Sequence, residues 1–270
     1  MPTKMSLGQY IPGDTFIHNL DPRVKIIATI IYMAGIFFVD SFIMYIPIFV
    51  FLFAVIFIAK LNPIQILKSL KPLLFVIIFT GILNILITPG EVLFHVWKFV
   101  VTKEGLIRAA FMSIRIVLLV MGTSILTLTT SAIALTDGME GVMSPLKIIK
   151  FPAHELSMMI SIALRFIPTL FEEADKIRKA QMARGANFDT GNIFQKAKSM
   201  VPLLVPLFLN SFRRADELAT AMVSRCYRGS EGRTRLNPLK MRTKDYLALL
   251  FVIVFFGAII AYRYLRWLRI

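Results

Sequence analysis

Cysteine and histidine are scarce in this chain of 270 residues, which contains one cysteine, Cys226, and three histidines. A single thiol excludes both a disulfide framework and a multi-thiolate metal site. Three scattered histidines are too few for a metal centre. No Gly-x-x-x-x-Gly-Lys-Ser/Thr phosphate loop occurs, so we expect that the chain itself binds no ATP, metal or other cofactor.

Charge is also in short supply, and acidic residues most of all. Charged residues make up 17% of the chain and hydrophobic residues 57%, whereas soluble domains carry about 25% charge. This composition predicts a membrane protein. The 31 basic and 16 acidic residues give a net charge of +15. We attribute the excess to basic flanks of membrane spans that contact anionic membrane lipid, and we expect no nucleic-acid partner.

Five apolar runs approach the ~20 residues that cross a bilayer core. The predicted spans are Val24–Val39, Phe42–Ala59, Pro72–Thr88, Leu106–Thr130 and Tyr246–Tyr262. We therefore predict an all-α membrane protein of about five transmembrane helices. The expected domains are residues 1–130, a membrane domain of about four spans; residues 131–244, a cytoplasmic domain of long amphipathic helices; and residues 245–270, a final span and tail.

The distribution of basic residues predicts the orientation. Three lysines separate the second and third runs (Lys60, Lys68 and Lys71), whereas nothing basic separates the first and second. The positive-inside bias thus places the N-terminus and residues 131–244 in the cytoplasm, in a multi-pass protein of the cytoplasmic membrane. Arg263, Arg266 and Arg269 fit this orientation poorly, because they would lie outside.

Residues 131–244 contain two helical patterns with matching ends, from about 154 to 184 and from about 201 or 206 to 225. Asp175 stands nine residues before Arg184, and Asp216 stands nine residues before Arg225. Gly185 occupies the usual helix-stop position after the first arginine, and Cys226 occupies the same place after the second. Because small side chains let helices approach closely, we expect the two helices to pack through Ala174, Ile177, Ala180, Ala215, Leu218 and Met222.

The two terminal arginines have two interpretations. A cation in the last turn of a helix interacts favourably with the helix dipole, by ~0.3–1 kcal/mol, so Arg184 and Arg225 could act within the helices alone. Arginine is also the side chain suited to forked contact with carboxylates. On this second interpretation the arginines insert into acidic grooves on two partner subunits.

Three stretches resemble one known family. They are LRFIPTLFEEADKIRKAQMARGANF from Leu164 to Phe188, HNLDPRVK from His18 to Lys25, and AMVSRCYRG from Ala221 to Gly229. Together they are similar to the transmembrane T component of energy-coupling-factor (ECF) transporters, EcfT, in the CbiQ-like family. The first Ala-Arg-Gly motif of that family corresponds to Ala183-Arg184-Gly185. The second departs from the pattern as Ser224-Arg225-Cys226.

The resemblance implies a non-catalytic subunit of an ATP-driven importer. Such a subunit joins two ABC-type ATPases (EcfA-like), which bind ATP-Mg, to an S component that binds a vitamin or a metal ion. Residues 131–244 would then be a coupling domain, with the arginine motifs seated in grooves of the ATPases. Ile160, Leu164 and Phe166 are expected to contribute an apolar platform for the S component.

Two other classes of membrane protein are less favoured by the sequence. A stand-alone secondary transporter would normally show inverted repeats of its spans, and the repeat here lies outside them. An intramembrane hydrolase is suggested by His154-Glu155 and by Glu172-Glu173. The first pair lacks the second histidine of a zinc-protease helix, and no partner histidines follow the second pair.

Three further features carry expectations. Asp21-Pro22 reads as a helix N-cap followed by proline in the first helical position. Arg115, inside the fourth run, is either a functional ion or contacts carbonyls or lipid headgroups. The segment Glu91–Gly105 is expected to form an outer interfacial helix or loop.

Overall fold

The computed structural model describes residues 10–96, 99–149, 151–188, 192–229 and 239–267. The chain divides into two compact units. We call Ser6–Val142 with Leu239–Ile270 the apolar unit. We call Met143–Pro238 the insert unit; Met1–Met5, which group with it, lie outside the described residues.

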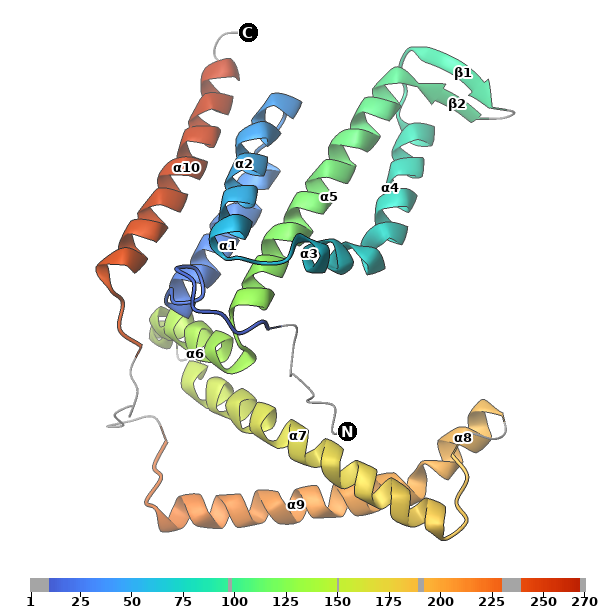
Figure 1. Ribbon diagram of the computed structural model, residues 1–270, viewed down its shortest axis with the longest axis vertical. Coiled ribbons are helices and arrows are strands. Elements are labelled where there is room, and N and C mark those ends of the chain that lie inside the picture. The colour runs from blue at the N-terminus through green and yellow to red at the C-terminus, as the bar shows by residue number, and fades with distance from the viewer. Residues whose placement is uncertain (1–9, 97–98, 150, 189–191, 230–238, 268–270) are drawn as a thin grey trace. The chain divides into compact units, whose positions relative to one another are not determined.

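The apolar unit is built almost wholly of helices (Figure 1). In chain order they are α1 Pro22–Phe37, α2 Phe42–Ile58, α3 Pro63–Leu70, the short 3₁₀ turn η1 Lys71–Leu73, α4 Leu74–Ile87, α5 Lys103–Thr129, α6 Ala132–Met143, whose last residue falls in the insert unit, and α10 Thr243–Trp267. The all-α prediction is confirmed. Asp21 caps α1 by accepting a hydrogen bond from the backbone N–H of Arg23, and Pro22 follows it, as expected.

Among the described residues, three helices are long and apolar enough to cross a membrane. They span Pro63–Ile87, Lys103–Thr129 and Thr243–Leu265, and the apolar helix Phe42–Ile58 is somewhat shorter. These helices contain the predicted second to fifth runs, give or take one or two residues at their ends. Figure 1 shows α3 turned away from the direction of α4, so the third span is not straight.

Aromatic side chains fill spaces left by glycines in the packing of the apolar unit. A methyl group on Gly35 of α1 would lie 2.2 Å from the ring of Phe256 on α10, and one on Gly122 of α5 would lie 2.1 Å from Tyr32 on α1. The hydroxyl of Tyr32 donates to the carbonyl of Leu118 on α5 at 2.6 Å. These contacts fix α1 between α5 and α10.

The segment after α4 differs from the prediction. Strands β1 Val92–Val96 and β2 Phe99–Thr102 pair antiparallel as a hairpin, where an interfacial helix or loop was expected. Residues 92–102 are rich in valine and phenylalanine, which favour a pleated strand over a helix. The prediction of a helix or loop was therefore wrong, because the β-branched and aromatic residues of this segment favour strands.

Two long helices dominate the insert unit. They are α7 Ala153–Ala183, of 31 residues, and α9 Val201–Ser224, of 24 residues; η2 Ser144–Ile149 precedes α7, and α8 Ile193–Ser199 lies between them. The two predicted helical patterns are confirmed to within a residue or two. Both helices continue through an internal proline, Pro168 in α7 and Pro206 in α9.

Candidate functional site

Contacts between α7 and α9 show that the two helices run antiparallel. Gln181, near the end of α7, donates to the carbonyl of Pro202 at the start of α9, at 3.4 Å. Glu173, two turns earlier on α7, meets Asn210 and Arg214 further along α9. The pair therefore places Arg184 beside the beginning of α9 and Arg225 at its far end (Figure 1). Because α9 has 24 residues at ~1.5 Å each, the two arginines are separated by roughly 36 Å of helix.

The end of α7 is a left-handed turn built around glycine. The N–H of Ala186 donates to the carbonyl of Gln181 at 2.9 Å, and the N–H of Gly185 donates to that of Met182 at 2.9 Å. Gly185 has φ +88°. This pair of bonds is the Schellman motif, in which the residue after the helix takes a left-handed conformation. Arg184 is the last residue before that turn, and it is exposed.

The end of α9 has the same geometry without the glycine. The N–H of Tyr227 donates to the carbonyl of Met222 at 3.0 Å, and that of Cys226 donates to Val223 at 2.9 Å. Cys226 has φ +57°, a region in which any residue with a Cβ is strained. Arg225 thus occupies the same cap position as Arg184 and is likewise exposed. The departure from Ala-Arg-Gly in the second motif leaves the turn intact.

The flanking residues of the two motifs are equally accessible. Ala183, Gly185, Ser224 and Cys226 are all exposed. Gly185 has open space around it, since nothing lies within 4 Å of where its Cβ would be. Each arginine therefore stands at an exposed helix end whose neighbouring residues are also exposed.

The six residues predicted to pack α7 against α9 have unequal surroundings. Ala174, Ile177, Leu218 and Met222 are partly buried, whereas Ala180 and Ala215 are exposed. Their packing role stays a prediction. The hydrogen bonds and the ion pair between the two helices centre on the carboxylate of Glu173, which lies 3.0 Å from the guanidinium of Arg214.

Sequence reasoning missed this polar contact, although the pattern contains a signal for it. Asn210, Arg214 and Leu218 recur every four residues and so share one face of α9. Phe166 and Glu173 of α7 line a hollow with the same three residues. An ion pair joins one specific residue of each helix and so defines the register of the two helices. Contacts between alanines are not directional and do not define the register.

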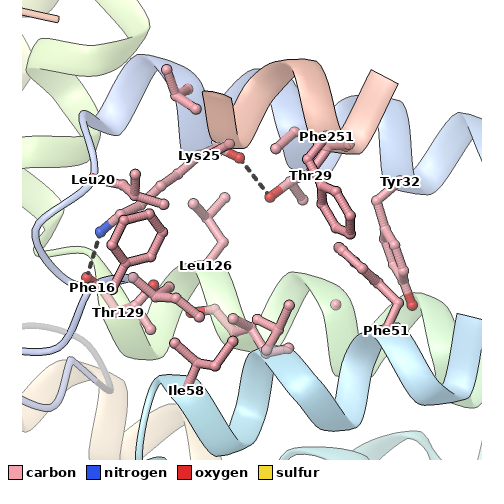
Figure 2. A pocket seen from close by; sticks show the side chains of 18 of the residues that line it. Phe16, Leu20, Lys25, Thr29, Tyr32, Phe51, Ile58, Leu126, Thr129 and Phe251 are labelled. Carbon is pink, nitrogen blue, oxygen red and sulfur yellow. Dashed lines mark hydrogen bonds between the residues drawn. The ribbon is translucent and has the colours of Figure 1, made fainter. Parts of the chain in front are cut away.

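A second group of buried polar residues lies in the apolar unit, where three helix ends meet. The carboxylate of Asp245 accepts the N–H of Asp21 at 2.9 Å and that of Arg242 at 2.7 Å, so it joins the N-termini of α1 and α10. Lys25 donates to the carbonyl of Thr129 at the end of α5, at 3.0 Å (Figure 2). Acidic groups thus face helix N-termini and a basic group faces a C-terminus, the arrangement that helix dipoles favour.

Two arginines of the apolar unit are accounted for by contacts. Arg115 donates to the carbonyl of Val39 at 2.7 Å and its guanidinium lies over the ring of Phe111 at 5.0 Å. This bears out the carbonyl contact expected for it. Arg263, which fitted the predicted orientation poorly, forms an ion pair with Asp40 in the turn between α1 and α2.

The hydrolase and metal-site alternatives find no support in the described residues. In this part of the chain, no three His, Cys, Asp or Glu side chains are grouped so that they could hold a metal ion. Glu173, one of the paired glutamates, is bonded to Asn210 and Arg214 of α9.

Comparison with known proteins identifies the family. Residues 13–236 match the CbiQ family, described as "Cobalt transport protein". The chain belongs to this family. Among curated relatives, the "Energy-coupling factor transporter transmembrane protein EcfT" of Clostridium kluyveri is 55% identical over 253 residues, which cover 93% of each chain.

Other relatives with the same name extend the similarity over almost the whole chain. EcfT of Acidaminococcus fermentans is 50% identical over 99% of this chain and 98% of its own length. EcfT of Bacillus subtilis is 44% identical over 94% of this chain and 96% of its own. The resemblance seen in the three sequence stretches is confirmed, and the chain is a transmembrane component of the ECF transporter class.

Proposed function

We propose that this CbiQ/EcfT family member is the non-catalytic T subunit of an ECF importer. It couples ATP hydrolysis by two partner ATPases to uptake of a vitamin or metal ion bound by an S component. One observation carries the proposal: α7 and α9 end in the same turn, and each turn presents an exposed arginine at its cap position. Two equivalent ends on an antiparallel pair suit two copies of one partner, one at each end.

The chemistry of the two ends favours an acidic groove as the partner site. A guanidinium makes paired hydrogen bonds with a carboxylate, and these charge-assisted bonds are stronger than neutral ones. Because α7 and α9 are held in register by Glu173 and Arg214, a push on one end is carried along a stiff helix. Closure of an ATPase dimer would then move the pair as one lever, with no chemistry on this chain.

The test is charge reversal at both ends. The variant Arg184→Glu/Arg225→Glu is expected to lose co-purification with the ATPases and to lose uptake. The variant Arg178→Glu/Arg213→Glu is its matched control, because it makes the same change of charge at two other exposed arginines on the same helices. If the tip variant assembles and transports as well as the control, the arginines are not the coupling contacts.

An exposed apolar stripe on α9 supports the S component as the second partner. Six residues at helical spacing are each about half exposed or more: Val201, Leu204, Val205, Phe208, Leu209 and Phe212. On α7, Ile160 is also exposed, and Leu164 and Phe166 are partly buried. The S component is proposed to dock on this surface. Replacing Phe208 by Gln should lower S-component co-purification and spare the ATPases, whereas Phe194→Gln on α8, a control with 82% exposure, should change neither.

The insert unit is proposed to lie in the cytoplasm. Arg263 at the far end of α10 fitted this orientation poorly, because it would be a cation on the outer side. Its ion pair with Asp40 neutralises that charge and so supports the orientation. Cys226 is the only cysteine of the chain and is exposed. A membrane-impermeant maleimide should therefore label it in inside-out vesicles and not in intact cells. The reverse pattern would exclude the orientation.

A further inference from the structure

The apolar unit contains a partly open cavity of about 400 Å³ between α1, α2, α5 and α10 (Figure 2). Its wall is almost entirely hydrocarbon. Figure 2 labels several of the side chains that form it, among them Leu20, Tyr32, Phe51, Ile58, Leu126 and Phe251. Two of its helices, α5 and α10, are long and apolar enough to cross a membrane, and the cavity lies beside the last two turns of α5 and the first turns of α10.

A second pocket of about 470 Å³ lies next to this cavity; most of its wall is apolar, but charged side chains also line it, and we call it the polar pocket for these groups. Phe16 and Ile58 line both spaces, so the two are neighbours. The polar pocket is also lined by Asp14, Thr15, His18 and Lys60. An amphiphile, with an apolar chain and a charged headgroup, would suit an apolar space beside a pocket that contains the cation Lys60 and the anion Asp14.

Lys60 reaches this pocket through an unusual backbone conformation. It has φ +51°, and its N–H donates to the carbonyl of Phe57 at 3.1 Å while that of Leu61 donates to Ile56 at 3.2 Å. This is the same left-handed helix end in which glycine is usual. Strained residues of this kind cluster at ligand sites, and here the strained residue carries an exposed ammonium group.

Lys25 lines the apolar cavity and does not line the polar pocket. Its ammonium donates to the carbonyls of His18 at 2.9 Å and Thr129 at 3.0 Å. These two bonds hold a buried positive charge at the end of the apolar cavity, near Phe16 (Figure 2). Asp21 and Asp245 interact electrostatically with this ammonium, so its charge is balanced within the protein.

We propose that the two neighbouring spaces together bind one zwitterionic phospholipid. An acyl chain occupies the apolar cavity, and a phosphoethanolamine headgroup occupies the polar pocket, with its phosphate at Lys60 and its ammonium at Asp14. Empty volume costs stability in proportion to its size, and apolar cavities do not hold water. Beside helices that can cross a membrane, the apolar molecule available to fill the space is a lipid chain.

Filling the cavity tests the acyl-chain half of the site. The full chain is reconstituted in vesicles of equal phosphatidylethanolamine and phosphatidylglycerol, extracted in mild detergent, and its retained lipid is counted by native mass spectrometry. Wild type should keep about one phosphatidylethanolamine. Ala248→Trp, which puts an indole into the cavity wall, should reduce retention about tenfold, because added volume excludes the chain. Ala258→Trp is the control, since Ala258 is exposed on the same helix.

The headgroup half is tested independently of cavity packing. Lys60→Asn removes the ammonium, and asparagine tolerates a left-handed conformation. It should lower retention about fivefold, since this corresponds to loss of one charge-assisted contact. Lys68→Asn, an exposed lysine outside both pockets, should have no effect. This variant keeps the experiment decisive if the tryptophan variant does not fold.

Three results would overturn the proposal. They are a wild-type chain that retains no lipid, equal retention by the Ala248 and Ala258 variants, and retention of phosphatidylglycerol in place of phosphatidylethanolamine. None of these results depends on Arg184 or Arg225, so the proposed function is tested separately.

Discussion

Cys226 and Gly185 occupy the same position in two equivalent helix ends, but only Cys226 carries a side chain. Both have positive φ, which costs a residue with a Cβ about 1 kcal/mol or somewhat more and costs glycine almost nothing. The end of α9 is therefore held in a strained conformation that the end of α7 adopts freely. A glycine at position 226 would relieve this strain at the end of α9.

A reciprocal pair of substitutions tests this difference. Cys226→Gly should raise the free energy of unfolding of the insert unit by about 1 kcal/mol, and Gly185→Ala should lower it by a similar amount. Nothing within 4 Å would obstruct the new Cβ at position 185, so its effect is purely one of backbone conformation. Chemical denaturation followed by circular dichroism measures both. Equal effects of one sign would contradict the assignment.

His18 is a second residue whose environment has a measurable consequence. Burial, and then the positive charge of Lys25, lower the pKa of His18 below its ordinary value of 6.5. The folded protein therefore holds the neutral ring, which is 2.6 Å from the hydroxyl of Thr15 and 3.2 Å from the carbonyl of Ile11. The unfolded chain takes up the proton first as pH falls, so the stability due to His18 is complete above pH 6.5 and is lost below it.

The measurement is the thermal midpoint of the chain in detergent between pH 7.5 and pH 5. Wild type should lose stability as the pH falls below about 6.5, while His18→Gln should show a shallower decline over the same range. A decline of equal slope in both proteins would show that other groups are responsible.

At the scale of elements, Asp245 joins two helix N-termini and Lys25 binds the end of a third. All three groups are buried: Asp21 is 7% exposed, Lys25 7% and Asp245 3%. Asp245→Asn keeps the shape but replaces one acceptor oxygen by a donor, so one of the two N–H groups loses its partner. Such a loss costs about 1–3 kcal/mol. Lys25→Met leaves both carboxylates without the nearby charge and should be at least as damaging.

The double variant distinguishes charge balance from hydrogen bonding. Lys25→Met/Asp245→Asn removes one charge of each sign, so it should be less destabilised than the sum of the single variants if the groups interact. Thermal unfolding of the four proteins, compared as a double-mutant cycle, gives the coupling energy. An additive cycle would show that these groups stabilise their helices independently.

Helices with clear helical periodicity were predictable from the sequence. Elements that depend on strand propensity or on which face of a helix is packed were not. The bounds of α7 and α9 follow from helical periodicity and from the residues after Arg184 and Arg225. The hairpin of β1 and β2 was missed because its β-branched and aromatic content was not weighed. The contact of Glu173 with Arg214 was missed because it depends on which face of α9 meets α7, and periodicity leaves several faces open.

At the scale of the whole chain, the chain leaves the apolar unit after α6 and returns to it before α10. In the apolar unit, residues near both points contact the N-terminal end of α1. The insert unit follows α6, in which a methyl group on Gly138 would lie 2.8 Å from Pro22. The chain returns at Leu239, just before the Arg242–Asp245 cap that is bonded to Asp21. Composition predicted that an amphipathic segment interrupts the spans. It gave no indication that one turn of α1 anchors both sides of the interruption.

The central claim is that the two arginine-bearing ends contact ATPase subunits. Cys226 offers the most direct measurement, because it is the only cysteine, is exposed, and follows Arg225 immediately. A photoreactive maleimide on Cys226, activated in the assembled transporter, should cross-link the chain to an ATPase, and Arg225→Glu should abolish the adduct. A transporter that is active yet gives no ATPase adduct, or gives the same adduct with Arg225→Glu, would contradict the account.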